Sequence, residues 1–186
     1  MSVDEFSTRF SKQAGVIHQV KNLSEAVSVI NDLIKSRGKG ESCASDEIDI
    51  SFGSLKSNIS NQLNTTINFN ELKTTPRKLI GQIDVGITKA EYGIAETGSI
   101  VDISYSDEHR LLSSLTRVHI ALLEEDSIVE KLSKLSLVMR DLLDSKKKSK
   151  PSITFIGGPS RTSDIELKSV LGVHGPHEVH VVLAMK

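Results

Sequence analysis

Short apolar segments alternate with amphipathic segments along the chain. Apolar residues recur at helical spacing in residues 3–12, and again after Asn22 in a longer segment that ends at Gly38 and Gly40. Asn22 and Glu25 have the spacing of a capping box, which is typical of the start of a helix. Further helices are predicted in residues 55–63, 75–82, 108–115 and 127–144.

Apolar runs rich in β-branched residues predict strands between these helices. The predicted strands cover residues 16–20, 48–52, 65–69, 85–88, 99–104, 117–123, 153–156 and 178–184. Alternating strands and helices are typical of a mostly parallel sheet that helices cover on both faces. The pattern therefore predicts an α/β fold, and 186 residues suit a single domain.

Charge narrows the range of partners. The 23 Lys and Arg residues nearly balance the 24 Asp and Glu residues, which gives a net charge of −1. A nucleic-acid-binding surface normally has a basic excess, so we expect no nucleic-acid partner. No apolar stretch reaches the roughly 18 residues of a membrane span, and the first residues lack the order of a signal peptide. We therefore expect a soluble, cytoplasmic protein, with the basic run at 146–150 ending a helix.

Cysteine and histidine usage argues against a metal site. The single cysteine, Cys43, excludes an internal disulfide and any cluster held by several thiolates of this chain, and its setting is interpreted as a loop. His174, His177 and His180 are three residues apart, and residues three apart on a strand point to opposite faces. No metal site is therefore predicted. His119 lies in an apolar strand and is interpreted as a core residue.

Three polar, glycine-rich loops carry the candidate chemistry. They have the sequences AETGS (residues 95–99), GGPSRTSD (157–164) and GVHGP (172–176). Ligands of open α/β sheets bind beyond the carboxyl ends of the strands, where we expect these loops to lie. None of them matches a phosphate-binding loop, a dinucleotide fingerprint or a nucleophile elbow.

The loop at 157–164 is interpreted as an anion site. Its two glycines let a ligand approach the backbone, and Arg161 can grip a carboxylate or phosphate with two hydrogen bonds. Ser163 and Glu166 have capping-box spacing, which predicts a helix start with free N–H groups. The alternative is that the hydroxyls and the carboxylate of this loop only satisfy turn backbone.

Glu96 and His174 are the candidates for proton transfer. A loop carboxylate such as Glu96 can act as a general base, an acid or a nucleophile, and it can equally cap a helix or pair with Arg161. His174 lies between glycines, where it can contact a ligand.

The segments AETGSIV, RVHIALL, GGPSRTSDIE and GVHGP, in this order, resemble the lactate-utilisation protein C family, also called the LUD domain. The resemblance begins near Gly86, so residues 83–186 carry the motifs and residues 1–82 of this single domain are less diagnostic. It implies a NagB/RpiA/CoA-transferase-like fold and a role in oxidising L-lactate to pyruvate together with iron–sulfur partner proteins. Ser99 departs from the family, which commonly has threonine there.

The resemblance and the loop chemistry together define the expected site. Glu96 and His174 are its catalytic candidates. The expected anion-binding residues are Thr97, Gly98, Gly157, Gly158, Pro159, Ser160, Arg161, Thr162, Asp164, Gly175 and Pro176.

This chain has no set of thiolates and no dinucleotide motif, so the iron–sulfur clusters are expected in partner subunits. The chain itself would bind a small carboxylate or phosphate or support assembly, and it can form a homo-oligomer. Two alternatives stay open. One is an acyl- or CoA-transferase-like or sugar-phosphate-handling enzyme that uses Glu96, and the other is a non-catalytic assembly module.

Overall fold

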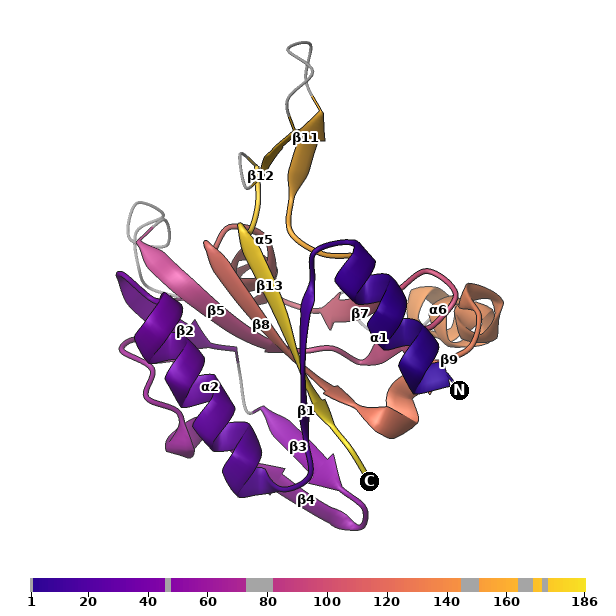
Figure 1. The fold of residues 1–186 in the computed structure, drawn as a ribbon, viewed down its shortest axis with the longest axis horizontal. Coiled ribbons are helices and arrows are strands. Elements are labelled where there is room, and N and C mark those ends of the chain that lie inside the picture. Colours follow the sequence, from indigo (N-terminus) through magenta and orange to yellow (C-terminus); the bar gives the residue numbers. More distant parts are fainter. Residues whose placement is uncertain (1, 46–47, 73–81, 145–150, 164–168, 172–173) are drawn as a thin grey trace.

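A five-stranded, fully parallel sheet with the order β1-β13-β8-β5-β2 forms the centre of the computed structural model (Figure 1). The structure describes residues 2–45, 48–72, 82–144, 151–163, 169–171 and 174–186. The strands are β1 (Val16–Val20), β2 (Glu41–Ala44), β5 (Ile83–Lys89), β8 (Val118–Glu124) and β13 (Glu178–Ala184). The inner strands read as nearly continuous apolar runs because both of their faces are buried. The predicted α/β class is confirmed.

A second sheet of four strands, in the order β10-β7-β6-β9, packs against one face of the first. It consists of β6 (Tyr92–Ile94), β7 (Ser99–Ser104), β9 (Ile128–Val129) and β10 (Ser152–Ile156). β7 is antiparallel to both β6 and β10, and β9 is parallel to β6. Two antiparallel pairs complete the strands, β3 (Asp49–Phe52) with β4 (Leu55–Asn58) and β11 (Arg161–Ser163) with β12 (Ser169–Leu171).

Helix α2 (Leu23–Arg37) covers one face of the central sheet. Its buried side chains, Ala26, Ile30 and Leu33, belong to one core cluster with residues of β1, β5, β8 and β13. The predicted capping box is present. Asn22 Oδ1 accepts a hydrogen bond from the Glu25 amide at 2.9 Å, and Glu25 Oε2 accepts one from the Lys21 amide at 2.8 Å.

Helix α1 (Ser2–Lys12) and the second sheet cover the opposite face. Phe6 and Phe10 are both 0% exposed, and their rings stack with centroids 5.7 Å apart. They pack with Ile100 of β7 and with the apolar side chains that β8 and β13 direct to this face. Helix α5 (Asp107–Ser114) packs on β5 and β8, while η3 (Leu132–Leu135) and α6 (Ser136–Asp144) pack on the outer face of the second sheet.

The helix predicted for residues 55–63 is wrong. This segment forms β4 and a 3-10 turn, η1 (Ser60–Gln62). Phe52 pairs with Leu55, so Gly53 and Ser54 make a two-residue hairpin turn, and Gly53 has the positive φ of 62° that such turns favour. Leu55 is 73% exposed, which shows that the helical spacing of the apolar residues here did not correspond to one buried face.

Three other predicted elements differ from the structure. The helix predicted for 127–144 instead contains η2 (Glu125–Ser127), β9 and η3 before α6, because Ile128 and Val129 pair with β6. The strand predicted for 65–69 is only an isolated bridge between Ile67 and Cys43, followed by α3 (Phe69–Leu72). Most of the helix predicted for 75–82 and the basic run at 146–150 lie outside the described residues.

The polar neighbours of Cys43 had suggested a loop, and this interpretation is wrong. Cys43 lies in β2 with 0% exposure, and burial raises the pKa of its thiol to about 12. A thiol that stays protonated is a poor nucleophile and metal ligand, so Cys43 acts as a small core residue. Within the described residues, every helix is too short or too polar to cross a lipid bilayer.

Candidate functional site

The end of α1 brings two of the predicted loops together at Gln13. The Gln13 Nε2 donates hydrogen bonds to the carbonyl oxygens of Thr97 and Gly98, both at 2.9 Å. On its other side lies the glycine pair of the second loop. A Cβ atom on Gly157 would lie 2.5 Å from Gln13 Oε1, and one on Gly158 would lie 2.5 Å from the Gln13 carbonyl oxygen. Gln13 therefore links the first loop to the second.

Gln13 is a site residue that the sequence reasoning missed. It directly follows α1, and its amide donates to the Phe10 carbonyl at 3.1 Å as the helix ends. Gly15 closes the same turn with a hydrogen bond to that carbonyl, and the chain then enters β1. A glycine shortly after a predicted helix is a recognised signal for such an ending, and it would have drawn attention to this turn.

The third loop joins the second at Ser160. The Ser160 amide donates a hydrogen bond to the Pro176 carbonyl at 2.9 Å, and a Cβ atom on Gly175 would lie 3.0 Å from the Ser160 Cβ. Gln13 thus contacts the first and second loops, and the third loop contacts the second. We call this arrangement the loop junction, which comprises Gln13, Thr97, Gly98, Gly157, Gly158, Pro159, Ser160, Arg161, Gly175 and Pro176.

A cavity of about 260 Å³ lies in the loop junction. Its lining residues are Gln13, Gly157, Gly158, Pro159 and Arg161. Arg161 is the only charged residue among them, and it is exposed at the start of β11. A guanidinium that lines a cavity can receive a planar carboxylate or a phosphate through paired hydrogen bonds.

The loop junction lies at the amino ends of central strands, so the expectation that these loops lie beyond their carboxyl ends is wrong. Gln13 shortly precedes β1, and Pro176 shortly precedes β13. The expectation treated every strand as part of one parallel sheet. β6 and β10, which precede the first two loops, belong instead to the second sheet.

The helical turn predicted to start at Ser163 falls on residues 164–168, which lie outside the described residues. Arg161, Thr162 and Ser163 form β11, in which Thr162 pairs with Val170 and Ser163 with Ser169. The backbone of residues 161–163 is therefore engaged in a strand pair. Asp164 lies outside the described residues.

The structure does not join the two catalytic candidates to the loop junction through side-chain contacts. Glu96 and His174 are exposed. The Glu96 amide donates to the Glu130 carbonyl at 3.0 Å, which adds the first loop to the β6–β9 pairing. The roles of Glu96 and His174 in proton transfer stay predictions.

A buried polar cluster between the two sheets was not predicted. Asp102 is 2% exposed, and its Oδ1 lies 2.8 Å from the His109 Nε2. Tyr92 of β6 pairs with Val101 of β7, so Glu91, just before β6, lies opposite Asp102. Glu91 Oε2 accepts a hydrogen bond from the Ile103 amide at 2.8 Å. Burial raises the pKa of Glu91 to about 7, and the charge of Asp102 acts in the same direction. The aspartate in the apolar run IVDIS was the available signal.

His119 borders this cluster and is a core residue, as predicted. It is 0% exposed, and its Nε2 lies 2.9 Å from the Thr88 Oγ1. Burial lowers the pKa of His119 to about 4, so the imidazole is neutral at physiological pH. His119 Nδ1 and Asp102 Oδ2 have no hydrogen-bond partner among the described residues. Glu91 is partly exposed, and its raised pKa makes it the member of the cluster that can take up or release a proton near neutral pH.

The other histidines do not build a metal site in the described part of the chain. His180 is buried, its Nδ1 lies 3.0 Å from the His18 Nε2, and its Nε2 lies 3.1 Å from Glu178 Oε2. Burial lowers the pKa of both His18 and His180. Among the described residues, no group of three or more His, Cys, Asp or Glu side chains is placed to hold a metal ion.

Gly158 should be the least tolerant position of the loop junction. Its φ of 149° is one that side chains rarely adopt, and a Cβ atom would meet the Gln13 carbonyl. Gly158→Ala is expected to lower the free energy of unfolding by about 1–3 kcal/mol in urea titrations. Gly53→Ala is the control for backbone strain alone, because Gly53 has a positive φ and open space around it. Equal effects of the two changes would contradict the steric argument.

Curated relatives are similar to this chain over part of their length. The chain is 37% identical over 95 residues to lactate utilization protein C of Halalkalibacterium halodurans, covering 51% of this chain and 41% of that protein. It is 36% identical over 102 residues to the Bacillus subtilis protein of the same name, covering 55% and 42%. The chain therefore matches about two fifths of the length of these relatives.

A solved structure shares the fold over nearly the whole chain. The crystal structure of a DUF162 family protein from Deinococcus radiodurans superposes with a TM-score of 0.63 at 17% identity, covering 98% of this chain and 96% of that one. The family model for the LUD domain matches residues 3–184. The resemblance seen in the motifs is thus confirmed, and the chain belongs to the LUD domain family.

Proposed function

We propose that this chain acts in lactate utilisation and that its loop junction binds a small carboxylate, such as L-lactate or pyruvate. The relatives named lactate utilization protein C support the first part. One observation supports the second part. Arg161 lines the same cavity as Gly157, Gly158 and Gln13, and Gln13 also holds the Thr97–Gly98 backbone.

Each part of the loop junction has a role in this proposal. The Arg161 guanidinium pairs with the carboxylate through two parallel hydrogen bonds. The glycine pair allows Gln13 to pack closely against the second loop, and Gln13 keeps two loops at a constant separation. Glu96 and His174, which flank the junction in sequence, would handle the proton of the lactate hydroxyl.

Oxidation of lactate to pyruvate removes two electrons, which an electron carrier must accept. The single cysteine of this chain cannot hold an iron–sulfur cluster, which typically needs four thiolates. We therefore place the electron carriers in partner proteins that contain iron–sulfur clusters. The chain would present or position the substrate for these partners.

Arg161→Ala is expected to weaken the binding of L-lactate by about tenfold or more, because a charge-assisted hydrogen-bond pair is lost. Isothermal titration calorimetry measures the effect, and Arg161→Lys should give an intermediate affinity because lysine keeps the charge but loses the fork. Arg140→Ala, at an exposed position of α6, is the matched control and should bind like the wild type. Unchanged affinity in Arg161→Ala would contradict the proposed anion site.

Growth tests the pathway independently of the binding site. A strain that lacks this protein should fail to grow with L-lactate as carbon source and should grow normally on glucose. The wild-type chain should restore growth on L-lactate, whereas Arg161→Ala should not. Normal growth of the deletion strain on L-lactate would contradict the role in lactate utilisation, whatever the calorimetry shows.

A further inference from the structure

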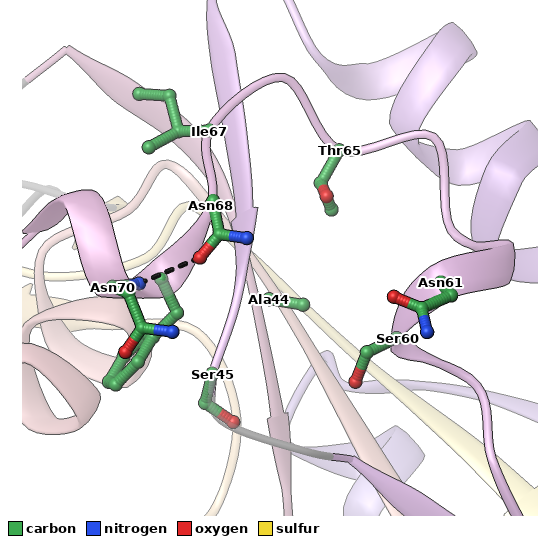
Figure 2. A pocket seen from close by; sticks show the side chains of 9 residues that line it. Ala44, Ser45, Ser60, Asn61, Thr65, Ile67, Asn68 and Asn70 are labelled. Carbon is green, nitrogen blue, oxygen red and sulfur yellow. Dashed lines mark hydrogen bonds between the residues drawn. The ribbon is translucent and has the colours of Figure 1, made fainter.

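A larger cavity, of about 540 Å³, lies at the carboxyl end of β2 (Figure 2). Ala44 is the last residue of β2, and the amide of Ser45 donates to the Ile87 carbonyl of β5 at 2.8 Å. η1 forms a second wall, and residues 65–70 form a third. The loop junction lies at the amino ends of β1 and β13, so the two cavities are at opposite ends of the parallel sheet. The carboxyl ends of parallel strands are where open α/β sheets bind ligands.

Tertiary hydrogen bonds hold the walls in place without a ligand. The Thr66 amide donates to the Ser42 carbonyl at 3.0 Å, and the Ser42 amide donates to Thr66 Oγ1 at 2.8 Å, which fixes the third wall beside β2. Asn31 of α2 holds the C-terminal end of η1, since its Nδ2 donates to the Gln62 carbonyl and its Oδ1 accepts from the Asn64 amide. The cavity is therefore preformed.

The described part of the lining is polar and carries no charged side chain. Six lining residues have an amide or hydroxyl group, namely Ser45, Ser60, Asn61, Thr65, Asn68 and Asn70. Ala44, Ile67 and Phe69 add apolar surface. Figure 2 shows the side chains of Asn61, Thr65 and Asn68 directed toward the space beside Ala44. Asn68 Oδ1 accepts from the Asn70 amide at 2.9 Å, which leaves the Asn68 NH₂ group directed toward the cavity.

We propose that this cavity binds an uncharged, hydroxyl-rich small molecule of the size of a monosaccharide or nucleoside. A hydroxyl group both donates and accepts hydrogen bonds, as do the amide and hydroxyl side chains of the lining. The volume lies within the range of small-molecule sites. A charged ligand would lose hydration here without meeting an opposite charge among the described lining residues, whereas the loop junction offers Arg161. The inference therefore adds a second site to the one in the proposed function.

Protein-observed NMR with D-ribose and adenosine as probes tests this site, with L-lactate as the anionic comparison. At least one neutral probe should shift the amides of residues 44–45, 60–61 and 65–70 in a saturable way, at concentrations up to about 10 mM. Thr65→Val preserves the shape and removes one hydroxyl, so it should weaken binding about fivefold. Asn61→Ala, at an exposed position, should have a similar effect and serves as the second variant if Thr65→Val misfolds.

Two controls separate this site from its surroundings and from the loop junction. Asn64→Ala removes an exposed asparagine next to the cavity but outside its lining, and it should leave the affinity unchanged. Arg161→Ala should also leave it unchanged, even where it abolishes lactate binding. The proposal is overturned if neither neutral probe shifts these amides, if L-lactate shifts them instead, or if binding survives in both Thr65→Val and Asn61→Ala.

Discussion

Replacing Phe10 with alanine is expected to lower the free energy of unfolding by about 3–5 kcal/mol, the usual effect of removing a fully buried aromatic ring. The Phe10 side chain is 0% exposed, it stacks on Phe6, and it lies against the backbone of Gly15. No nearby side chain can fill the volume without breaking the contacts of α1 with β8 and β13. Urea unfolding followed by far-ultraviolet circular dichroism measures the change, since the chain has no tryptophan.

The change should also loosen the loop junction, because Gln13 follows directly from the turn that Phe10 anchors. Phe10→Ala should therefore weaken L-lactate binding even at temperatures where the protein remains folded. Phe155→Ala is the matched control. Phe155 is 47% exposed on β10, so its removal should lower stability by less than about 1 kcal/mol. A similar loss of stability in the two variants would contradict the assignment of Phe10 to the core.

Glu91→Gln is expected to become more stable relative to the wild type as pH rises, by about 3 kcal/mol between pH 4.5 and pH 8. The pKa of Glu91 is raised from 4.5 to about 7 in the folded protein. Between these values the folded protein holds a proton that the unfolded chain has released. The stability contributed by Glu91 is therefore fully present below pH 4.5 and is lost as pH rises through 7. Glutamine is neutral at every pH and can still accept the hydrogen bond from the Ile103 amide.

Comparison with the variant isolates this effect from other titrations. The groups that act on Glu91 are Asp102 across the strand pair and His109 from α5, and both remain in the variant. His119 has the opposite dependence, because its lowered pKa makes stability fall as pH decreases below 6.5 toward 4. Its contribution cancels in the difference. Urea unfolding across the pH range gives both profiles, and Glu5→Gln, at a 44% exposed side chain, controls for the loss of one carboxylate. Parallel profiles would show that Glu91 is ionised throughout.

The spacing of apolar residues correctly predicted those helices and strands whose buried residues follow a regular helical or strand periodicity. α1 and α2 are where their apolar spacing placed them, and the Asn22–Glu25 capping box marks the start of α2 as expected. The five strands of the central sheet were also largely predicted, except that β2 was missed because its sequence, ESCA, lacks branched apolar residues. Residues 128–129 show the limit of this approach. The apolar spacing around them is compatible with a helix. Their backbone instead pairs with β6, which lies more than 30 residues earlier in the sequence.

For the candidate site, the sequence identified the glycine-rich loops and Arg161, because turn glycines and clustered polar side chains are visible locally. It did not identify Gln13, whose role depends on where α1 ends relative to loops some 85 and 145 residues later. It also placed the loops at the wrong ends of the strands, since nothing in a strand's own residues states to which sheet it belongs.

By itself, the sequence determined the α/β class, the family and the polar loops, all of which depend on residue type and short-range spacing. Only the tertiary structure decided that a second sheet covers one face, that Glu91 and Asp102 meet in a buried cluster, and that an uncharged cavity opens beyond β2. Each of these depends on contacts between distant segments. Hydrogen-bond partners and burial are set when the chain packs. A local sequence pattern predicts them only where apolar residues recur regularly on one face of a helix or strand and that face packs on the core.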